Sequence, residues 1–314
     1  PATIESLGGG VSNQVLRVVA PGRAFVLKQS RPQLRTRDAW FSDLDRIWRE
    51  QEVMQALHPH LPDIVPAVLH VDRANYVYAM SHAPFDSRVW KTDLLAGSID
   101  LSLGEKVGRV LGRMHQVSAE RAAEFAAFRD HTVYVQLRVD PFYVRVQERR
   151  PEVADAIQPI IGEMLTRKEA LCHGDYTPKN MLIHGAGFTL VDYETAHFGD
   201  PTMDLGLFLA HLTLKAIRGP SQAQPFIALM RAFWSGYAQE ARFRPLPELE
   251  ARGMRHLGIC LLARVDGTSP VDYLSEAQRE CVRKQGRDIL LQGMDRWEAI
   301  WRDGLPPPAG IVKP

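Results

Sequence analysis

The stretch LCHGDYTPKNMLIHGAGFTLVDYE, residues 171–194, decides the fold of this chain. It places Asp175 and Asn180 in a short polar segment, and Asp192 follows an apolar run. The apolar residues on both sides of Gly-Ala-Gly predict a β-hairpin over residues 180–194. A hairpin returns the chain to its starting point, so we expect Asp192 to lie beside Asn180.

The spacing of these residues indicates phosphoryl transfer. Protein kinases carry H-R-D-x-x-x-x-N followed by D-F-G, with the same interval between Asp and Asn. This chemistry depends mainly on positioning and charge stabilisation. We therefore expect Asp175 to be the base or orienting carboxylate for an acceptor hydroxyl. Because Mg²⁺ prefers oxygen ligands, Asn180 and Asp192 are the expected ligands. The alternative is a polar loop with a capping Asp, but the whole array is more specific than any one residue.

The first 80 residues predict a strand-rich lobe with one helix. Residues 14–20 and 24–30 are rich in Val, Leu and Phe and flank the turn Pro21-Gly22, which predicts a hairpin. Residues 74–80 form a third run of this kind. Residues 38–60 predict an amphipathic helix, because apolar residues recur there at helical spacing at Leu44, Ile47, Met54 and Leu57.

The same region contains a candidate nucleotide site. GGGVSNQV, residues 8–15, matches the glycine-rich loop G-x-G-x-x-G-x-V except that Asn13 replaces the third Gly. Asn is the residue besides Gly that best tolerates positive φ, so the exchange is mild. Gly8, Gly9, Gly10 and Asn13 are expected to cover the ATP phosphates, although a plain turn between strands is an alternative.

Lys28 ends the next apolar strand, where a phosphate-binding lysine would lie. Glu50 falls on the apolar stripe of the predicted helix, and a carboxylate there is costly unless it is paired. We therefore predict an ion pair between Lys28 and Glu50, the pair that holds the ATP phosphates in kinases. Glu52 is the second choice of partner.

From residue 81 onward the pattern is mainly helical. Residues 103–114, 151–165 and 200–217 carry apolar stripes, and three further helical patterns follow. The hairpin over residues 180–194 is the only strand pair expected here. The sequence predicts an α+β, two-lobed, protein-kinase-like fold with a small antiparallel β-lobe and a large helical lobe. Its parts are residues 1–80, a hinge at 81–84, a catalytic lobe at 85–303 and a loose tail at 304–314.

Three further residues have expected supporting roles. The connector after Met80 is placed to offer backbone groups to adenine. Asp204 begins a long apolar helix, where it either holds the backbone of the catalytic loop or simply caps the helix. His173 is expected to support that loop rather than to transfer protons.

Composition excludes several classes of function. The formal net charge is +1 and the basic residues are dispersed, which argues against nucleic acid binding. No apolar run is long enough to span a bilayer. Three cysteines without metal or redox spacing predict reduced thiols and a cytoplasmic protein. Cys172 next to His173 allows a nucleophile, but a small buried apolar residue is the favoured interpretation.

The acceptor is predicted to be a small molecule with a hydroxyl group. Protein kinases have a long activation segment after the metal-binding Asp, ending in A-P-E. Only seven residues, YETAHFG, separate Asp192 from Asp200. They leave little platform for a peptide or another large substrate.

These motifs resemble those of a known superfamily. HGDYTPKNML, residues 173–182, and VDYETAHFGDPTMDL, residues 191–205, are similar to the aminoglycoside phosphotransferase and choline kinase superfamily. In the first lobe, LGGGVSNQVLRV, VLKQSRPQLR and DAWFSDLDRIWREQEVM resemble methylthioribose kinases. The resemblance covers roughly residues 5–300. It implies an ATP- and Mg²⁺-dependent kinase that phosphorylates a sugar or an amino alcohol.

The resemblance also concerns the end of the chain. ARVDGTSPVDYL, residues 263–274, is similar to a segment of methylthioribose kinases whose two arginines lie at the sugar and the transferring phosphate. Only Arg264 matches, because Ala263 replaces the first arginine. Lys179 and Arg264 are thus candidates for stabilising the transferred charge. An aminoglycoside or choline kinase and a non-catalytic nucleotide-binding module remain alternatives.

Overall fold

The computed structural model describes residues 2–8, 13–30, 44–185, 187–219, 221 and 223–302. Its chain divides into two compact units. Unit 1 consists of Pro1–Val89 and Asn180–Ala196, and unit 2 of Trp90–Lys179 and His197–Pro314. The hairpin after Asn180 is thus grouped with the N-terminal sheet. The lobe boundaries expected from the sequence, 1–80, 81–84 and 85–303, remain a prediction, and the tail lies outside the described residues.

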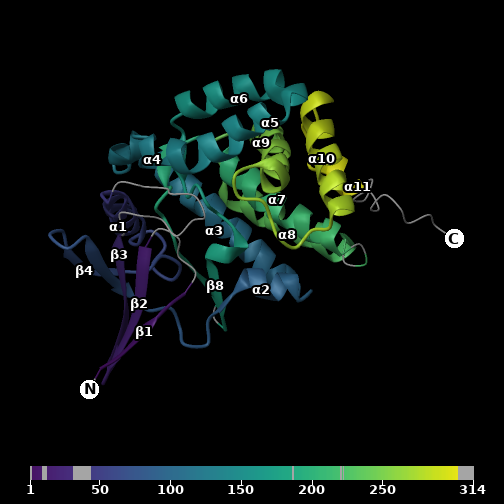
Figure 1. Ribbon diagram of the computed structural model, residues 1–314. Coiled ribbons are helices and arrows are strands. Elements are labelled where there is room, and N and C mark those ends of the chain that lie inside the picture. The colour runs from purple at the N-terminus through teal and green to yellow at the C-terminus, as the bar shows by residue number, and fades with distance from the viewer. Residues whose placement is uncertain are drawn as a thin grey trace. The chain divides into compact units, whose positions relative to one another are not determined.

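Unit 1 is built on an antiparallel sheet with the strand order β1-β2-β3-β5-β4 (Figure 1). Its strands are β1 (Thr3–Ser6), β2 (Asn13–Ala20), β3 (Arg23–Ser30), β4 (Val68–Asp72) and β5 (Val77–Ser81). The three predicted strands correspond to β2, β3 and β5. The sequence analysis missed β1, which is exposed along its length, and β4, whose register is broken by an irregularity. Neither strand shows a regular apolar alternation.

The hairpin of β2 and β3 sets the position of the expected phosphate-binding lysine. Its turn contains Gly22 with φ of +76°, a left-handed conformation that glycine adopts without a steric cost. The register places Val15 opposite Lys28. Helix α1 (Arg46–Leu57) carries Glu50 on its buried side. It is shorter than the predicted range 38–60, because the chain leaves the helix at His58 and residues 31–43 lie outside the described residues.

A second sheet in unit 1 holds the predicted hairpin. Strands β8 (Met181–His184) and β9 (Gly187–Leu190) pair antiparallel, and β6 (Arg88–Val89) pairs with β8. The backbone N–H of Leu190 donates to the carbonyl of Ile64 at 2.9 Å. The hairpin that the sequence predicted is confirmed by this pairing.

Unit 2 is mainly helical, as predicted. Its helices are α2 (Trp90–Leu95), α3 (Leu101–Glu120), α4 (Thr132–Tyr134), α5 (Arg145–Arg149), α6 (Ala154–Thr166), α7 (Thr202–Arg218), α8 (Ala223–Glu240), α9 (Leu246–Asp266), α10 (Glu276–Leu291) and α11 (Glu298–Arg302). A π-helix, η2 (Val135–Val144), joins α4 to α5. The expectation of a single strand pair after residue 81 was wrong. The short strands β7 (Ala170–Cys172) and β10 (His197–Gly199) also pair, and three-residue strands leave no clear apolar pattern.

The core of unit 2 depends on closely packed helices. Helices α3 and α8 cross where Gly108 faces Phe233 and Gly236 faces Glu105. A Cβ atom on Gly108 would lie 1.9 Å from the carbonyl oxygen of Phe233, so no other residue fits there. Helix α7 is buried along most of its length. Such a helix can hold charged residues only where partners or ligands compensate their burial.

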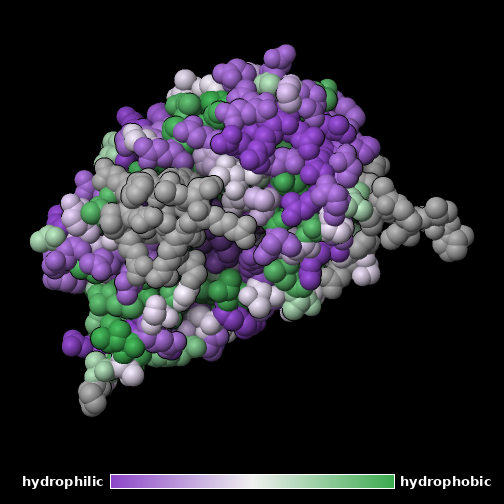
Figure 2. All heavy atoms as spheres, in the orientation of Figure 1, coloured by the Kyte–Doolittle hydropathy of each residue, from purple (hydrophilic) through white to green (hydrophobic). Residues whose placement is uncertain are grey.

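The surface of the described residues is ordinary for a globular protein. Figure 2 shows mainly hydrophilic residues over α6 and α10 on the visible face of unit 2. Among the described residues, no helix combines the length and the apolar character that crossing a bilayer requires.

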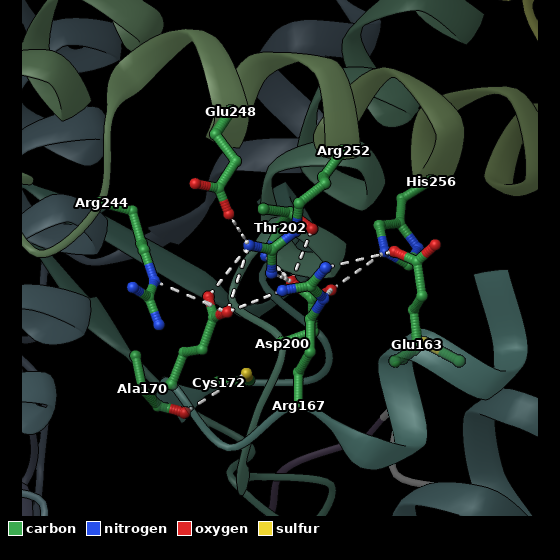
Figure 3. Close-up of polar contacts among 12 residues, drawn as sticks. Glu163, Arg167, Ala170, Cys172, Asp200, Thr202, Arg244, Glu248, Arg252 and His256 are labelled. Carbon is green, nitrogen blue, oxygen red and sulfur yellow. Dashed lines mark hydrogen bonds and ion pairs between the residues drawn. The ribbon is translucent and has the colours of Figure 1, made fainter.

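Unit 2 contains a buried ion network centred on Arg252 of α9 (Figure 3). The guanidinium binds Asp200, Glu169 at 3.0 Å and Glu248 at 2.9 Å. Asp200 also accepts hydrogen bonds from the hydroxyl and the backbone N–H of Thr202, at the start of α7. Burial alone would raise the pKa of Asp200, but His256 and Arg252 outweigh it and hold the pKa below its usual range. The network thereby fixes the start of α7 against α9.

We predict that Arg252→Leu lowers the free energy of unfolding by about 3–5 kcal/mol, because removing one partner leaves buried carboxylates uncompensated. Chemical denaturation at pH 7 measures the change. Arg113→Leu is the matched control, since Arg113 is exposed on α3 and no ion pair is found for it within the described part of the chain. Equal stability of the two variants would contradict the structural role of the network.

Candidate active site

The candidate nucleotide residues of unit 1 meet at the ammonium of Lys28. Lys28 lies on β3 and is only 6% exposed. Its Nζ is 2.7 Å from Oε2 of Glu50 and 3.1 Å from Oδ1 of Asp192. The predicted ion pair of Lys28 and Glu50 is therefore confirmed. Glu52, the second choice, instead pairs with Arg73 at 2.9 Å on the surface.

Glu50 connects Lys28 to the hairpin that follows Asn180. Its carboxylate accepts a hydrogen bond from the backbone N–H of Tyr193 at 3.2 Å. Burial raises the pKa of Glu50 to about 7, although the positive charge of Lys28 opposes this, and the nearby Asp192 adds to the rise. Lys28 stays protonated, because Glu50 and Asp192 outweigh the effect of burial and raise its pKa. One buried cation is thus shared by two carboxylates.

The candidate metal ligands lie next to each other in unit 1. Asp192 has φ of +74°, an uncommon conformation for a residue other than glycine and one that occurs at functional sites. The backbone N–H of Val191 donates to the carbonyl of Asn180 at 3.0 Å, so the hairpin brings Asp192 back to Asn180 as expected.

This donor set fits a magnesium ion. Within the described residues, no group of three His, Cys, Asp or Glu is placed to hold a metal. Mg²⁺, however, usually takes one or two carboxylates together with phosphate oxygens and water. Asp192 and the side-chain oxygen of Asn180 provide such ligands.

The glycine-rich segment is described only at its two ends. Gly9 and Gly10 lie outside the described residues, and a Cβ atom on Gly8 would meet only open space. Asn13 begins β2, and its amide donates to Glu194 at 3.4 Å. The expected phosphate cover therefore remains a prediction. Met80 is buried near the end of β5, and its expected position at adenine also remains a prediction.

In unit 2, Asp204 holds the loop that carries the candidate base. Its carboxylate accepts hydrogen bonds from the backbone N–H of His173 at 2.7 Å and of Gly174 at 2.9 Å. Of the two roles expected for Asp204, the structure therefore shows the first, support of the loop backbone. His173 is fully buried, and its Nδ1 accepts a hydrogen bond from the backbone N–H of Asp175 at 3.2 Å. This contact confirms the expected supporting role of His173.

Asp175 lies between two cations of unit 2. Its Oδ2 is 2.8 Å from Nζ of Lys179 and 2.9 Å from Nη2 of Arg138. Arg138 also donates to the carbonyl of Gly174 at 2.8 Å. The sequence analysis missed Arg138, because it lies on the π-helix η2, whose irregular backbone leaves no periodic signal. Helices of this type often occur at functional sites, which fits its position here.

Arg264 of α9 is linked to the same region through an aromatic ring. Its guanidinium lies 6.0 Å from the ring centroid of Phe142, and that of Arg138 lies 5.6 Å from it. Asp175 is among the charges that act on Arg264.

Cys172 is fully buried, and burial raises the pKa of its thiol. It therefore fits the interpretation as a small core residue rather than a nucleophile.

The comparisons with known proteins agree with this geometry. Residues 3–246 match the model of a family described as "Phosphotransferase enzyme family". Methylthioribose kinase 2 of Oryza sativa subsp. japonica is 23% identical over 240 residues, which cover 68% of this chain and 56% of the rice protein. A methylthioribose kinase of Exiguobacterium sibiricum is 25% identical over 279 residues, covering 80% of this chain and 71% of that protein. The chain thus spans little more than half the length of the rice relative.

Solved structures share the fold. One is an amicoumacin kinase in complex with AMP-PNP and Ca²⁺. It has a TM-score of 0.53 and 14% identity, with coverage of 94% of this chain and 90% of that one. Identity at this level indicates a common fold and no more.

The role of Asp204 in holding the loop predicts that the stability of the protein depends on pH. Burial would raise the pKa of Asp204, but the hydrogen bond and charge of His115, with smaller contributions from His173, hold the pKa below its usual range. A carboxylate whose pKa is lower in the folded state stabilises the fold above its unfolded pKa of about 4 and loses that contribution on further acidification.

We therefore expect the free energy of unfolding to fall steeply below pH 5, and less steeply in Asp204→Asn. At pH 7 the variant should be destabilised by about 1.5–3 kcal/mol, the value of hydrogen bonds to a charged group. Urea denaturation from pH 3 to 7 measures both effects. Parallel pH profiles of the two proteins would contradict this assignment.

Proposed function

Because this chain belongs to the phosphotransferase enzyme family, we propose that it transfers the γ-phosphoryl group of ATP to a hydroxyl of a small molecule. The observation that carries the proposal is the buried cation Lys28, shared by Glu50 and Asp192. A lysine held in this way fits phosphate binding, because it keeps its charge and a fixed position. The names of the relatives favour a sugar, as in methylthioribose kinases, over an amino alcohol.

In unit 1, each residue has a role that follows from its contacts. Lys28 would bind the α- and β-phosphates, and Glu50 would orient Lys28 through their ion pair. Asn180 and Asp192 would hold Mg²⁺, which when bound neutralises charge on the phosphates. Gly8, Gly9, Gly10 and Asn13 would cover the phosphates, and backbone groups at Met80 would receive the adenine.

In unit 2, Asp175 would accept the proton of the acceptor hydroxyl. The hydroxyl oxygen then forms a bond to the γ-phosphorus, the bond from that phosphorus to the ADP oxygen breaks, and ADP leaves with the electron pair. Lys179 and Arg264 would stabilise the charge on the transferred group. Arg138 would hold the carboxylate of Asp175 in place, and Asp204 would fix the backbone of the loop.

We expect Asp175→Asn to lower kcat by at least about 100-fold, the lower range for loss of a general base, while ATP still binds. Mg²⁺-dependent ADP release with sugars, choline, ethanolamine and aminoglycosides as acceptors gives kcat, and calorimetry gives the Kd of ATP. Asp155→Asn is the control, because Asp155 is exposed on α6 and away from these residues.

Near-normal turnover of Asp175→Asn would refute the role of Asp175. If ATP binds to the natural chain and no acceptor in a broad panel gives turnover, the alternative of a non-catalytic nucleotide-binding module would take the place of this proposal.

A further inference from the structure

The last turn of α7 contains a buried cation that the proposed function does not use. Lys215 is 2% exposed. Its Nζ donates to the carbonyl of His211 at 3.0 Å and lies 5.9 Å from the ring centroid of Tyr273. No carboxylate within the described residues lies at ion-pair distance from it. Such a charge is costly, because buried ammonium groups are normally paired.

The surroundings of Lys215 are also positive. Burial, together with the charges of three neighbouring cations, lowers the pKa of Lys215 to about 7. Burial likewise lowers the pKa of the half-buried His211, followed by the charges of four neighbouring cations. We call these groups the cation cluster: Lys91, Lys179, His211, Lys215, Arg218 and Arg264.

The helix itself does not account for this arrangement. A cation in the last turn of a helix interacts favourably with the helix dipole, which would raise the pKa of Lys215. The pKa is lowered instead, so burial and like charges outweigh the dipole. Of the carboxylates in the described part of the chain, Asp175 is already held by Lys179 and Arg138, and Asp272 is exposed. The fold therefore keeps positive charges together that repel each other.

Unused hydrogen-bond donors lie in the same place. Nε of Arg264 and the hydroxyl of Tyr273 are buried and have no hydrogen-bond partner among the described residues. Among the described residues, Lys215 uses one of its three donors, toward a backbone carbonyl. Part of the cluster reaches the surface, because His211 and Arg264 are partly exposed and Lys179 is 49% exposed. Donors and positive charge together are what an anion requires.

The cluster adjoins the candidate base. Lys179, which contacts Asp175 at 2.8 Å, is among the charges acting on His211. Arg264 shares the ring of Phe142 with Arg138, the other partner of Asp175. The cation cluster thus contains a residue, Lys179, that contacts the candidate base directly.

Resting on the proposed function, we infer that the phosphate acceptor is itself an anion, a small hydroxy compound whose carboxylate or phosphate group binds Lys215, Arg264 and Tyr273. The cluster repels cationic acceptors such as amino alcohols and aminoglycosides, because repulsion between like charges is strong at partly buried sites. Lys179, which contacts Asp175 at 2.8 Å, is assigned to the transferred phosphoryl group, and Lys215 is left for the acceptor. Arg264 would serve both groups.

The first test uses small hydroxy compounds of similar size that carry a negative charge, no charge or a positive charge. Glucose is compared with gluconate, and glycerol with glycerate, glycerol 3-phosphate and ethanolamine. We expect kcat/KM to be at least 100-fold higher for a carboxylate- or phosphate-bearing acceptor than for its neutral partner, and the two kinds of anion distinguish the two sources of charge.

Preference for the neutral or cationic members would overturn this inference and leave the proposed function intact. If no acceptor is turned over, calorimetry measures whether gluconate and glycerol 3-phosphate bind. If neither anion binds at millimolar concentration, the inference is also overturned.

The second test is Lys215→Met, which keeps the length of the side chain. We expect KM for the anionic acceptor to rise at least tenfold, while KM for ATP stays within twofold. The Tm should not fall, because an apolar side chain replaces an unpaired buried charge. Arg113→Met removes one exposed charge as the control. An unchanged acceptor KM, or a raised KM for ATP instead, would overturn the inference.

A third readout separates binding from structure. Because the pKa of Lys215 is about 7, an anion bound beside it should raise that pKa and cause proton uptake. Calorimetry with gluconate and glycerol 3-phosphate at pH 7.5, in two buffers of different ionisation enthalpy, measures the uptake. The uptake should disappear in Lys215→Met; binding of both anions without it would contradict a contact with Lys215.

Discussion

The site in unit 1 depends on one constraint, the pairing of the buried cation Lys28. An ammonium group in an apolar strand is stable only with carboxylates at contact distance, and Glu50 and Asp192 provide them from two other segments of the chain. Helix α1 must therefore face β3, and the hairpin must end beside both. The same contacts that compensate the burial of Lys28 thereby assemble the residues proposed to bind nucleotide and metal.

Unit 2 uses carboxylates in a similar way around the start of α7. Asp200 takes part in the network of Arg252, and Asp204 holds the backbone of the loop with Asp175. The two residues lie one helical turn apart, so one helix end connects the core of the unit to the candidate base. At its other end the same helix carries the buried Lys215, for which the described residues provide no carboxylate partner. The contrast between paired and unpaired charges on α7 is the basis for assigning an anionic acceptor.

Much of this arrangement could be predicted from the sequence because it follows local rules. A carboxylate on an apolar helix stripe demands a partner, which identified Glu50 for Lys28. A hairpin must return to its origin, which placed Asp192 by Asn180. Other features depend on tertiary context. Arg138 lies on an irregular helix, which leaves no periodic pattern in the sequence. Lys215 resembles any cation at a helix end, because the sequence does not show that its side chain is buried.

The most direct test of the account is a double-mutant cycle on Lys28 and Glu50, measured as the Kd of Mg²⁺-ATP by calorimetry. We predict that Lys28→Met and Glu50→Gln each weaken binding of Mg²⁺-ATP at least about tenfold. Because the two residues act as a unit, we expect their effects to be non-additive. The double variant should then bind no more weakly than Lys28→Met alone. Glu52→Gln, on the same helix but paired with Arg73 at the surface, should bind like the natural chain. Undiminished binding by Lys28→Met, or independent and additive losses, would contradict the proposal that this buried pair forms the nucleotide site.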